Sequence, residues 1–480
     1  MTLLKSSFRN KIPNRGLLCR QWPWKPGDGF HLLGILLLVG AVIAAMPALA
    51  QGGIFNVRAF GATGNGVADD APAIQAAEVA AEKAGGGTVY LPAGKYLMNS
   101  SVLVGSNIEL HGDGDTTVLI RSNTPSKVPD YGADCTTSTP PLGTFTPLLW
   151  NRHYNCEDQN IYLHDFKADG SAITTVPCGP FLGLSGLVNS TVANITLVNT
   201  PQDAMFFRNG GVNLTVKNNK ILLHNTLWGN GAGINIEMHV NGQIWGPANI
   251  TNNQIVTGAT NFCTAALKQS CSRDSDCSGL QLATCGKGGS DITGIAITWA
   301  DGTHPPVVTI TNNQIWVGNN HYGIICNGCV DSTISGNVIR PMKLRHVPGV
   351  GTYTGISSYS TAGGAVQNLT IEGNTIEGTG ESGDGPAINV SGLGVSENGL
   401  TIQDNVIAHK NTSSSNAVIQ VSGLKNVAVS GNRLCFVPSN AIHLGSPGRP
   451  VVNGTQTKNT ILHMGKQSGR PPKECSTLPQ

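Results

Sequence analysis

VTITNNQI, at Val308–Ile315, is one of seven copies of a phrase that recurs through the last two-thirds of this 480-residue chain. In each copy β-branched and polar residues alternate, and an Asn, one variable residue and an Ile or Leu follow. The other copies are LTVKNNKI (Leu214–Ile221), ITNNQI (Ile250–Ile255), STISGNVI (Ser332–Ile339), LTIEGNTI (Leu369–Ile376), LTIQDNVI (Leu400–Ile407) and VAVSGNRL (Val427–Leu434). Alternation at period 2 predicts a strand. Repetition at steps of 24 to 60 residues predicts a solenoid, because one repeat can bury its apolar face only against a neighbour.

The anchoring Asn of the phrase is expected at a turn. It falls at positions 219, 253, 313, 337, 374, 405 and 432. Asn tolerates left-handed backbone geometry, and its amide can pair with the equivalent amide one coil away. The steps between these positions are uneven, which predicts constant strands and loops of variable length on one side, where a solenoid keeps its function.

A second short strand, often of the form Gly-Ile-x-Ile, follows the phrase. Examples are AGINIEM (Ala232–Met238), TGIAIT (Thr293–Thr298), YGIIC (Tyr322–Cys326), PAINVS (Pro386–Ser391) and NAIHLG (Asn440–Gly445). A strand, a tight Asn turn, a second strand and a loop make one coil. The predicted fold is therefore all-β, a single-stranded parallel β-helix, in which inward Ile and Val stack on their copies at the inter-strand spacing of about 4.8 Å.

The first fifty residues have the pattern of a secretion signal. Six cations precede an apolar run at Leu32–Met46, and Pro47-Ala48-Leu49-Ala50 supplies an Ala-x-Ala cleavage site before Gln51. The apolar run is short for a membrane-spanning helix, which needs about 18 residues. Without the leader the chain has 30 − 6 = 24 basic and 28 − 1 = 27 acidic residues, a net charge of −3. Nothing in the remaining sequence suggests a nucleic-acid partner, which would need a clustered basic face, and we expect no membrane partner after cleavage.

These observations predict the domain organisation. We expect a signal peptide at 1–50, a β-helix at 51–465 and a tail at 466–480, with the oligomeric state left open. Cys263, Cys271, Cys277 and Cys285 lie in an insert at 261–289, whose spacings match no zinc pattern and favour two disulfides in a surface loop. For the CNGC stretch at Cys326–Cys329 we expect a local disulfide or two stacked thiols rather than a redox motif.

The block after the leader predicts a cap and a first coil at 51–100. FNVRAFGATGNGVADDAPAIQAA (Phe55–Ala77) indicates a strand, a Gly/Asn loop and a helix with Asp69 and Asp70 at its N-cap. GGGTVYLPAGKYLM (Gly85–Met98) indicates a strand, a turn and a strand. The helix would close the first coil, because an open solenoid end presents unpaired strand edges.

This block resembles the opening of pectate-lyase-superfamily proteins, the group with rhamnogalacturonase-like and epimerase-like domains. They begin with a similar FGA.GDG..DDT.AIQ.A stretch followed by G.V.LP.G.Y. The resemblance covers about 45 residues; beyond it only the coil pattern is similar. It implies a right-handed parallel β-helix and action on acidic plant or microbial polysaccharide. It leaves the reaction open, because one scaffold hosts hydrolases, lyases, epimerases and phage tailspikes.

Stacking the Gly-Ile-x-Ile strands in register gives two outward columns. One column contains Phe206, Asn235, Ala296, Ile325, Ser357 and Asn389, and the other contains Arg208, Glu237, Thr298, Asn327, Tyr359 and Ser391. Arg208 then lies beside Glu237 on successive coils. Asp203 lies at the start of the Arg208 strand, and Asp301 lies just past the end of the Thr298 strand. We predict that these four residues form a charge cluster, with Trp245, Trp299 and Tyr322 placed to stack on sugar rings.

Two chemistries would use such a cluster. A glycosidase needs two carboxylates, one of them protonated. A lyase needs a base beside the uronate, with Asp203, Glu237 and Asp301 as acid/base groups or Ca²⁺ ligands and Arg208 as base or carboxylate clamp. No cofactor is otherwise indicated. The structural alternative is a surface ion pair between Arg208 and Glu237, worth about 0–1 kcal/mol.

The predicted function is a secreted enzyme, extracellular or periplasmic, that cleaves or modifies an acidic polysaccharide as a lyase, hydrolase or epimerase. The alternative is a non-catalytic glycan-binding, adhesin-like or tailspike-like β-helix.

Overall fold

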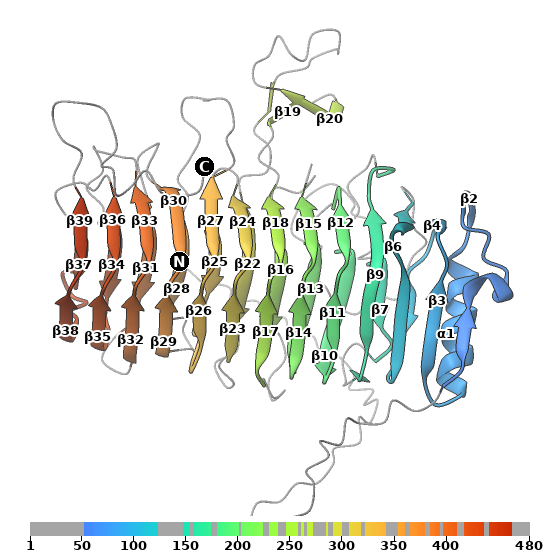
Figure 1. Cartoon of the computed structure of the whole chain (residues 1–480), viewed down its shortest axis with the longest axis horizontal. Helices are drawn as coiled ribbons and strands as arrows, with labels where there is room; N and C mark the ends of the chain where they lie inside the picture. Colours follow the sequence, from blue (N-terminus) through green and yellow to red (C-terminus); the bar gives the residue numbers. More distant parts are fainter. Residues whose placement is uncertain are drawn as a thin grey trace, which may run out of the picture. The chain divides into compact units, whose positions relative to one another are not determined.

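A computed structural model gives the fold. It describes residues 52–122, 147–153, 158–173, 180–200, 203–223, 230–238, 246–257, 261–263, 266–271, 285–286, 291–299, 307–317, 322–341, 354–360, 365–379, 385–393, 397–409, 417–435 and 441–462. Within these residues the predicted β-helix is confirmed. Parallel strands stack in chain order in three rows (Figure 1).

Row 1 begins each coil. Its strands are β1 (Ile54–Asn56), β3 (Gly87–Leu91), β6 (Ile108–Arg121), β9 (Tyr162–Asp169), β11 (Thr191–Ala193), β14 (Leu214–Lys217), β17 (Ala248–Thr251), β23 (Val308–Thr311), β26 (Thr333–Ser335), β29 (Gln367–Glu372), β32 (Asn398–Gln403), β35 (Lys425–Ser430) and β38 (Val452–Thr457). The long strands β6 and β9 continue into row 2, so rows 1 and 2 together form one 24-stranded sheet.

Row 2 follows the Asn turn. Its other strands are β2 (Asn65–Asp69), β4 (Gly94–Met98), β12 (Thr196–Val198), β15 (Lys220–Leu223), β18 (Gln254–Thr257), β24 (Gln314–Val317), β27 (Val338–Pro341), β30 (Thr375–Thr379), β33 (Val406–His409), β36 (Arg433–Cys435) and β39 (Thr460–Leu462). The recurring phrase is therefore two strands with a turn between them. A coil has three strands, where the sequence had suggested two.

Row 3 contains the Gly-Ile-x-Ile strands and forms a separate 12-stranded sheet. Its strands are β5 (Val102–Val104), β7 (Leu149–Asn151), β8 (Asp158–Gln159), β10 (Leu182–Val188), β13 (Met205–Val212), β16 (Asn230–Met238), β22 (Asp291–Trp299), β25 (Tyr322–Cys326), β28 (Thr354–Tyr359), β31 (Ile388–Ser391), β34 (Ile419–Ser422) and β37 (Ile442–Leu444). Side chains point alternately inward and outward along each strand. On β16, Ile234 and Ile236 are fully buried in the core, and so is Ile295 on β22. The alternate residues of these strands, such as Asn235, form the outer face of row 3.

The anchoring Asn residues form the predicted amide ladder. Asn313 shows the pattern: its Oδ1 accepts from the backbone N–H and the Nδ2 of Asn253, at 2.9 and 3.0 Å, and its own Nδ2 donates to Asn337 and to the carbonyl of Ile250. The same bonds link positions 219, 253, 313, 337, 374, 405, 432 and 459. The ladder lies inside the turn between rows 1 and 2 and satisfies polar groups that would otherwise be buried without partners.

The left-handed residue of this turn lies one position before the predicted one. Asn312 has φ = 56° and Gly336 has φ = 62°, whereas the ladder residues Asn313 and Asn337 have no positive φ. Gly, Asn or Asp occupies this position in the seven copies of the phrase, where a side chain with a larger Cβ substituent pays a steric cost; Lys458, before Asn459 at the end of the ladder, is the exception, with φ = 56°.

Helix α1 (Ala71–Lys83) follows the 3-10 turn η1 (Val57–Phe60) and β2, and contacts β1, β3 and β5. Asp70 occupies the N-cap position, but its carboxylate accepts from the backbone N–H groups of Thr63 and Gly64 instead of from the helix. Asp69 takes the capping bond, from the N–H of Ala71 at 3.2 Å. That α1 closes the solenoid stays a prediction.

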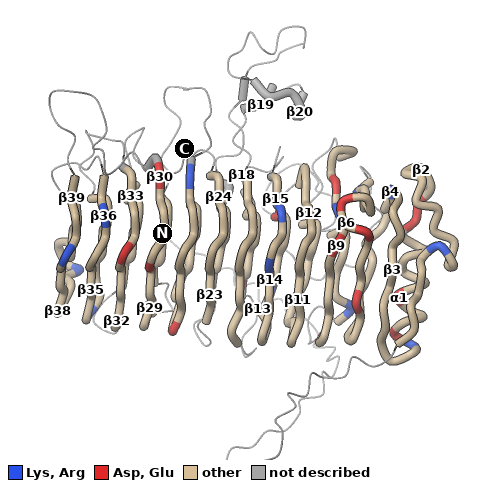
Figure 2. The backbone as a smooth tube through the Cα atoms, in the orientation of Figure 1, with Lys and Arg blue, Asp and Glu red and all other residues tan. Residues whose placement is uncertain are grey.

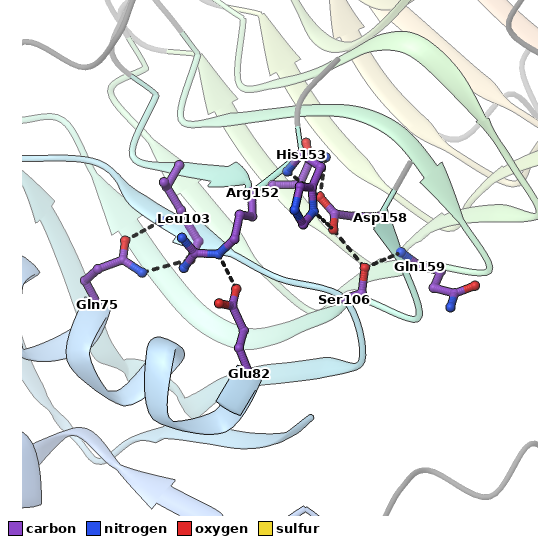
Figure 3. A network of polar contacts seen from close by, with 9 residues as sticks. Gln75, Glu82, Leu103, Ser106, Arg152, His153, Asp158 and Gln159 are labelled. Atoms are coloured by element: carbon purple, nitrogen blue, oxygen red, sulfur yellow. Dashed lines mark hydrogen bonds and ion pairs between the residues drawn. The ribbon is translucent and has the colours of Figure 1, made fainter. Parts of the chain in front are cut away.

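Side chains attach α1 to the first coils. Gln75 exchanges two hydrogen bonds with the backbone of Leu103, and Glu82 forms an ion pair with Arg152. Figure 3 shows these contacts together with the buried carboxylate of Asp158, which accepts from His153 and Ser106. The helix is thus bound by polar contacts as well as by its apolar face.

The cysteine predictions are tested in part. Cys326 and Cys329 form the local disulfide that was expected as one alternative. In the insert the backbone forms a small antiparallel sheet of β19 (Asn261–Cys263), β20 (Ala266–Cys271) and β21 (Cys285–Gly286). The two disulfides predicted for this insert, the leader and the tail all lie outside the residues whose side chains the structure describes, so these predictions stay open.

Candidate functional site

The register of row 3 brings the predicted columns together. Phe206 pairs with Asn235 and Arg208 pairs with Glu237 between β13 and β16. Asn235 continues to Ala296, and Glu237 continues to Thr298 on β22. Regular spacing of the Gly-Ile-x-Ile motif fixed this register, because a one-residue slip would turn every Ile of a strand outward.

Asp203 is the most perturbed group of the candidate site. Its side chain is 7% exposed, and its Oδ1 accepts from the backbone N–H of Ala232 on the next coil at 2.6 Å. Burial, with a smaller contribution from the negative charge of Glu237, raises the pKa of Asp203 to about 7, against the opposing hydrogen bonds from Ala232 and Asn235. Near neutral pH this carboxyl is therefore present in both protonated and ionised forms.

Asn235 was missed as a functional residue. It stood in the predicted column as a neutral side chain, but its amide hydrogen-bonds the carboxyl of Asp203. Its Oδ1 is buried and has no hydrogen-bond partner among the described residues. An unsatisfied acceptor beside a protonatable carboxyl is available to a bound hydroxyl group.

Arg208 and Glu237 complete the described cluster. Both side chains are partly exposed on the outer face of row 3, and both make interactions beyond those given above. The cluster therefore combines a buried carboxyl, a partly exposed carboxylate, an amide and a guanidinium on two successive coils. Such a set can donate a proton, accept a proton and bind an anionic group.

Tyr322 is the one predicted sugar-binding aromatic that the structure describes. It is half-buried and packs on Ala232, Ala296 and Ile325 of the outer face of row 3. Burial raises the pKa of its hydroxyl, and so does the neighbouring Tyr359. Asp301, Trp245 and the side chain of Trp299 lie outside the described residues, so their predicted roles are untested.

A second polar cluster lies on row 1. His111 and His164 stack with ring centroids 5.1 Å apart, and His164 Nε2 lies 3.0 Å from Glu109 Oε1. Burial raises the pKa of Glu109, but hydrogen bonds from Thr88 and His164 outweigh this effect and lower that pKa below its ordinary value. The rings cover one another and the carboxylate is satisfied, so this cluster offers less to a substrate than the Asp203 cluster.

Charge is sparse along the middle coils. Figure 2 shows few charged residues from β11 to β24 and more around α1, β6 and β9. The described residues contain no group of three or more His, Cys, Asp or Glu that could hold a metal ion. The predicted Ca²⁺ ligation is untested, because Asp301, one of the three predicted ligands, lies outside these residues. In the same residues no helix is long and apolar enough to cross a membrane.

Comparison with known proteins supports the fold. A family model described as rhamnogalacturonase A/epimerase, pectate lyase-like, matches residues 54–291. Mannuronan C5-epimerase AlgE3 of Azotobacter vinelandii is 52% identical over 64 residues, 13% of this chain and 4% of that protein. Alginate lyase 7 of the same organism is 40% identical over 99 residues, 16% of this chain and 12% of that protein. The chain thus covers a small part of these relatives.

Solved structures share the architecture. The A-module of mannuronan C5-epimerase AlgE4 of Azotobacter vinelandii superposes with a TM-score of 0.56 at 18% identity. The superposition covers 85% of this chain and 96% of that module. PfbA, a surface adhesin of Streptococcus pneumoniae, has a TM-score of 0.52 at 15% identity, covering 87% and 94%. At these identities the likeness concerns the fold alone.

Proposed function

Because the chain is a pectate-lyase-like parallel β-helix protein, we propose that it binds an anionic, uronate-containing polysaccharide on the outer face of row 3 and removes the C5 proton of one uronate there. The observation that carries the proposal is the buried carboxyl of Asp203, whose pKa is raised to about 7, close enough to the Glu237 carboxylate to be affected by its charge, while Glu237 pairs in register with Arg208 on the neighbouring strand. Acid–base groups of this kind cluster at active sites.

Each residue of the cluster has a role in this reaction. Arg208 binds the carboxylate of the uronate and makes the C5 proton more acidic. Glu237 accepts that proton, and the electron pair left at C5 forms the C4–C5 double bond as the C4–O bond to the neighbouring sugar breaks. Asp203 donates its proton to the leaving oxygen. In an epimerase the same first step is followed by return of a proton to the opposite face of C5.

The names of the relatives support the proposal that the reaction occurs at C5 of a uronate. Those matched by sequence are named as a C5-epimerase and an alginate lyase, and proton abstraction at C5 is common to epimerisation and elimination. A disulfide between Cys326 and Cys329 fits an oxidising compartment, and we expect the predicted leader to direct the chain out of the cytoplasm.

Incubation with alginate, polygalacturonate and pectin in heavy water, with Ca²⁺ or with a chelator, tests the proposal. A UV-absorbing unsaturated product indicates elimination, and deuterium at C5 in an uncut chain indicates epimerisation. We expect Asp203→Asn and Glu237→Gln each to lower the rate by about 10²–10⁴-fold. The control Glu372→Gln alters a carboxylate on row 1 and should leave the rate unchanged.

Two results would contradict the assignment. New reducing ends without an unsaturated product would indicate hydrolysis. Full activity in both site variants would place the chemistry elsewhere.

The second candidate is an adhesin-like protein that binds glycans without modifying them. The sparse charge along the middle coils favours it. Binding of these polysaccharides with no product and no deuterium incorporation would support this alternative.

A further inference from the structure

The outer face of row 3 continues past the candidate site to the C-terminal coils, and its character changes there. From Phe206 to Ile325 the first column is mainly apolar, apart from Asn235, whereas from Ser357 onward both columns are polar. Ser357 pairs with Asn389 and Asn389 pairs with Gln420 in the first column. Tyr359 pairs with Ser391 and Ser391 pairs with Ser422 in the second. None of these side chains carries a negative charge.

Arg449 adds a positive charge to this part of the face. The chain makes a tight turn after β37, in which Ser446 and Arg449 exchange two backbone hydrogen bonds, and the carbonyl of Arg449 accepts from the N–H of Gly423. Its side chain lies back over the preceding coils, and Nη1 donates to Ser391 Oγ at 3.2 Å. Ser391 Oγ in turn lies 3.2 Å from Ser422 Oγ.

The guanidinium has capacity left for a ligand. Arg449 is exposed and forms no ion pair with any residue that the structure describes. A guanidinium carries five N–H donors, and one of them is used by Ser391. A carboxylate is the group that takes two parallel donors from such a fork.

Tyr359 supplies an apolar contact one coil from Ser391, the residue that the Arg449 guanidinium contacts. It is 39% exposed, although it is a large aromatic residue on a sheet face. An exposed Tyr ring packs against the apolar face of a sugar while its hydroxyl stays in water. Tyr359, Ser391, Ser422 and Arg449 therefore form a strip, here called the distal strip, in which the cation of Arg449 contacts Ser391, the register partner of the aromatic Tyr359.

We propose that the distal strip is a second binding subsite for the anionic polysaccharide, in which Arg449 binds the carboxylate of a uronate several sugars away from the one at Asp203. This inference rests on the proposed function and adds a direction to it: the bound chain runs along the outer face of row 3 from β13 toward β37. The two positions are five coil steps apart, from Arg208 on β13 to Ser391 on β31, or roughly 24 Å at about 4.8 Å per step.

The length of the ligand provides the test. An oligouronate of about three sugars is too short to bridge the roughly 24 Å set by the coil spacing, whereas one of about ten sugars bridges it. Binding is measured by calorimetry with alginate- and polygalacturonate-derived oligomers of both lengths, on full-length protein carrying Asp203→Asn so that turnover does not interfere.

We expect Arg449→Ala to raise the Kd for the long oligomers by roughly tenfold to a hundredfold and to leave the short ones unaffected, because a charge-assisted contact is lost. Arg449→Lys should restore part of the affinity, and Tyr359→Ala should weaken the binding of the long oligomers alone. The matched control is Arg433→Ala, which removes the same charge on β36 in row 2 at the same end of the β-helix.

The outcomes separate the two proposals. Long oligomers that bind Arg449→Ala as tightly as the parent protein overturn the distal subsite and leave the proposed function standing. If no uronate oligomer binds the parent protein, both proposals are wrong. An equal loss in Arg433→Ala and Arg449→Ala shows a general charge effect and also overturns the subsite.

Discussion

At the scale of single residues, the chemistry of the site depends on where burial and charge meet. Asp203 and Glu237 were both visible in the sequence as carboxylates on neighbouring repeats, but only the structure shows that one is buried and the other partly exposed. Burial raises the proton affinity of Asp203, and this makes Asp203 the candidate proton donor of the cluster.

A titration of the Asp203 carboxyl tests this description. We expect its NMR signal to titrate with a midpoint near pH 7, far above the ordinary value of 3.8, since burial raises the pKa to about 7. Glu237→Gln should move the midpoint to lower pH, because it removes a negative charge that favours the protonated form. A midpoint at the ordinary aspartate value, or one that is unaffected by Glu237→Gln, would contradict the coupling.

Because folding raises the pKa of Asp203, the contribution of this residue to the stability of the fold depends on pH. The contribution of Asp203 to stability is fully present below its unfolded-state value and is lost as pH rises through about 7. A reaction that needs the protonated form should slow over the same rise. The proposed enzyme therefore works best on the acidic side of neutrality.

At the scale of strands and turns, the sequence predicted much of the fold. The β-branched alternation, the Gly-Ile-x-Ile register and the Asn ladder are local patterns repeated at every coil, so each copy supports the others. The division of the phrase into two strands was missed. The left-handed position between the two strands holds Asn, Gly or Asp, as at Asn312, Gly336 and Asp404, so no single residue type marks the turn.

Features set by non-repeating segments could not be predicted. Trp150 lies in the outward column next to Gly183, yet it is fully buried. Sequence alternation gives the direction of such a side chain and does not give its burial. Arg449 was missed for a related reason, because it belongs to a turn and reaches Ser391, which is 58 residues earlier in the chain.

The Asn ladder makes a prediction at this scale. Asn313→Ala should lower the free energy of unfolding by about 2–4 kcal/mol, because it leaves buried donors and acceptors of Asn253, Asn337 and Ile250 without partners. Asn459→Ala at the end of the ladder should have a smaller effect, since Asn459 is partly exposed and water can replace its bonds. Denaturant unfolding of the two variants measures the difference; equal losses would show that position in the ladder does not matter.

At the scale of the whole molecule, the β-helix unit separates its tasks among its faces. Rows 1 and 2 carry the ladder that stabilises the stack, while row 3 presents the titratable cluster and the distal strip on one surface. Stacked repeats contact mainly their neighbours, so local changes on row 3 alter binding with little effect on distant coils. The end of the stack is different, because α1 contacts several strands of the first coils at once.

The stability of this end should depend on pH through Glu78. The side chain of Glu78, on α1, is fully buried, and neither carboxyl oxygen has a side-chain hydrogen-bond partner among the described residues. Burial raises the pKa of Glu78 well above 4.5, and the neighbouring Glu82 carboxylate raises it further. The stabilising contribution of the neutral form is fully present below the ordinary glutamate value and is lost as pH rises through the raised value.

We expect Glu78→Met to remove this loss, because Met fills a similar volume without an ionisable group. At pH 8 the variant should exceed the parent protein in free energy of unfolding by on the order of 1–3 kcal/mol, and the excess should shrink toward pH 4. Gln75→Met serves as the control on the same helix: it removes two hydrogen bonds to Leu103 and should lower stability by a similar amount at every pH. The measurement is the unfolding free energy of all three proteins from pH 4 to pH 8. Parallel curves for Glu78→Met and the parent would show that the buried carboxyl of Glu78 does not ionise before the stack unfolds, and would contradict the prediction.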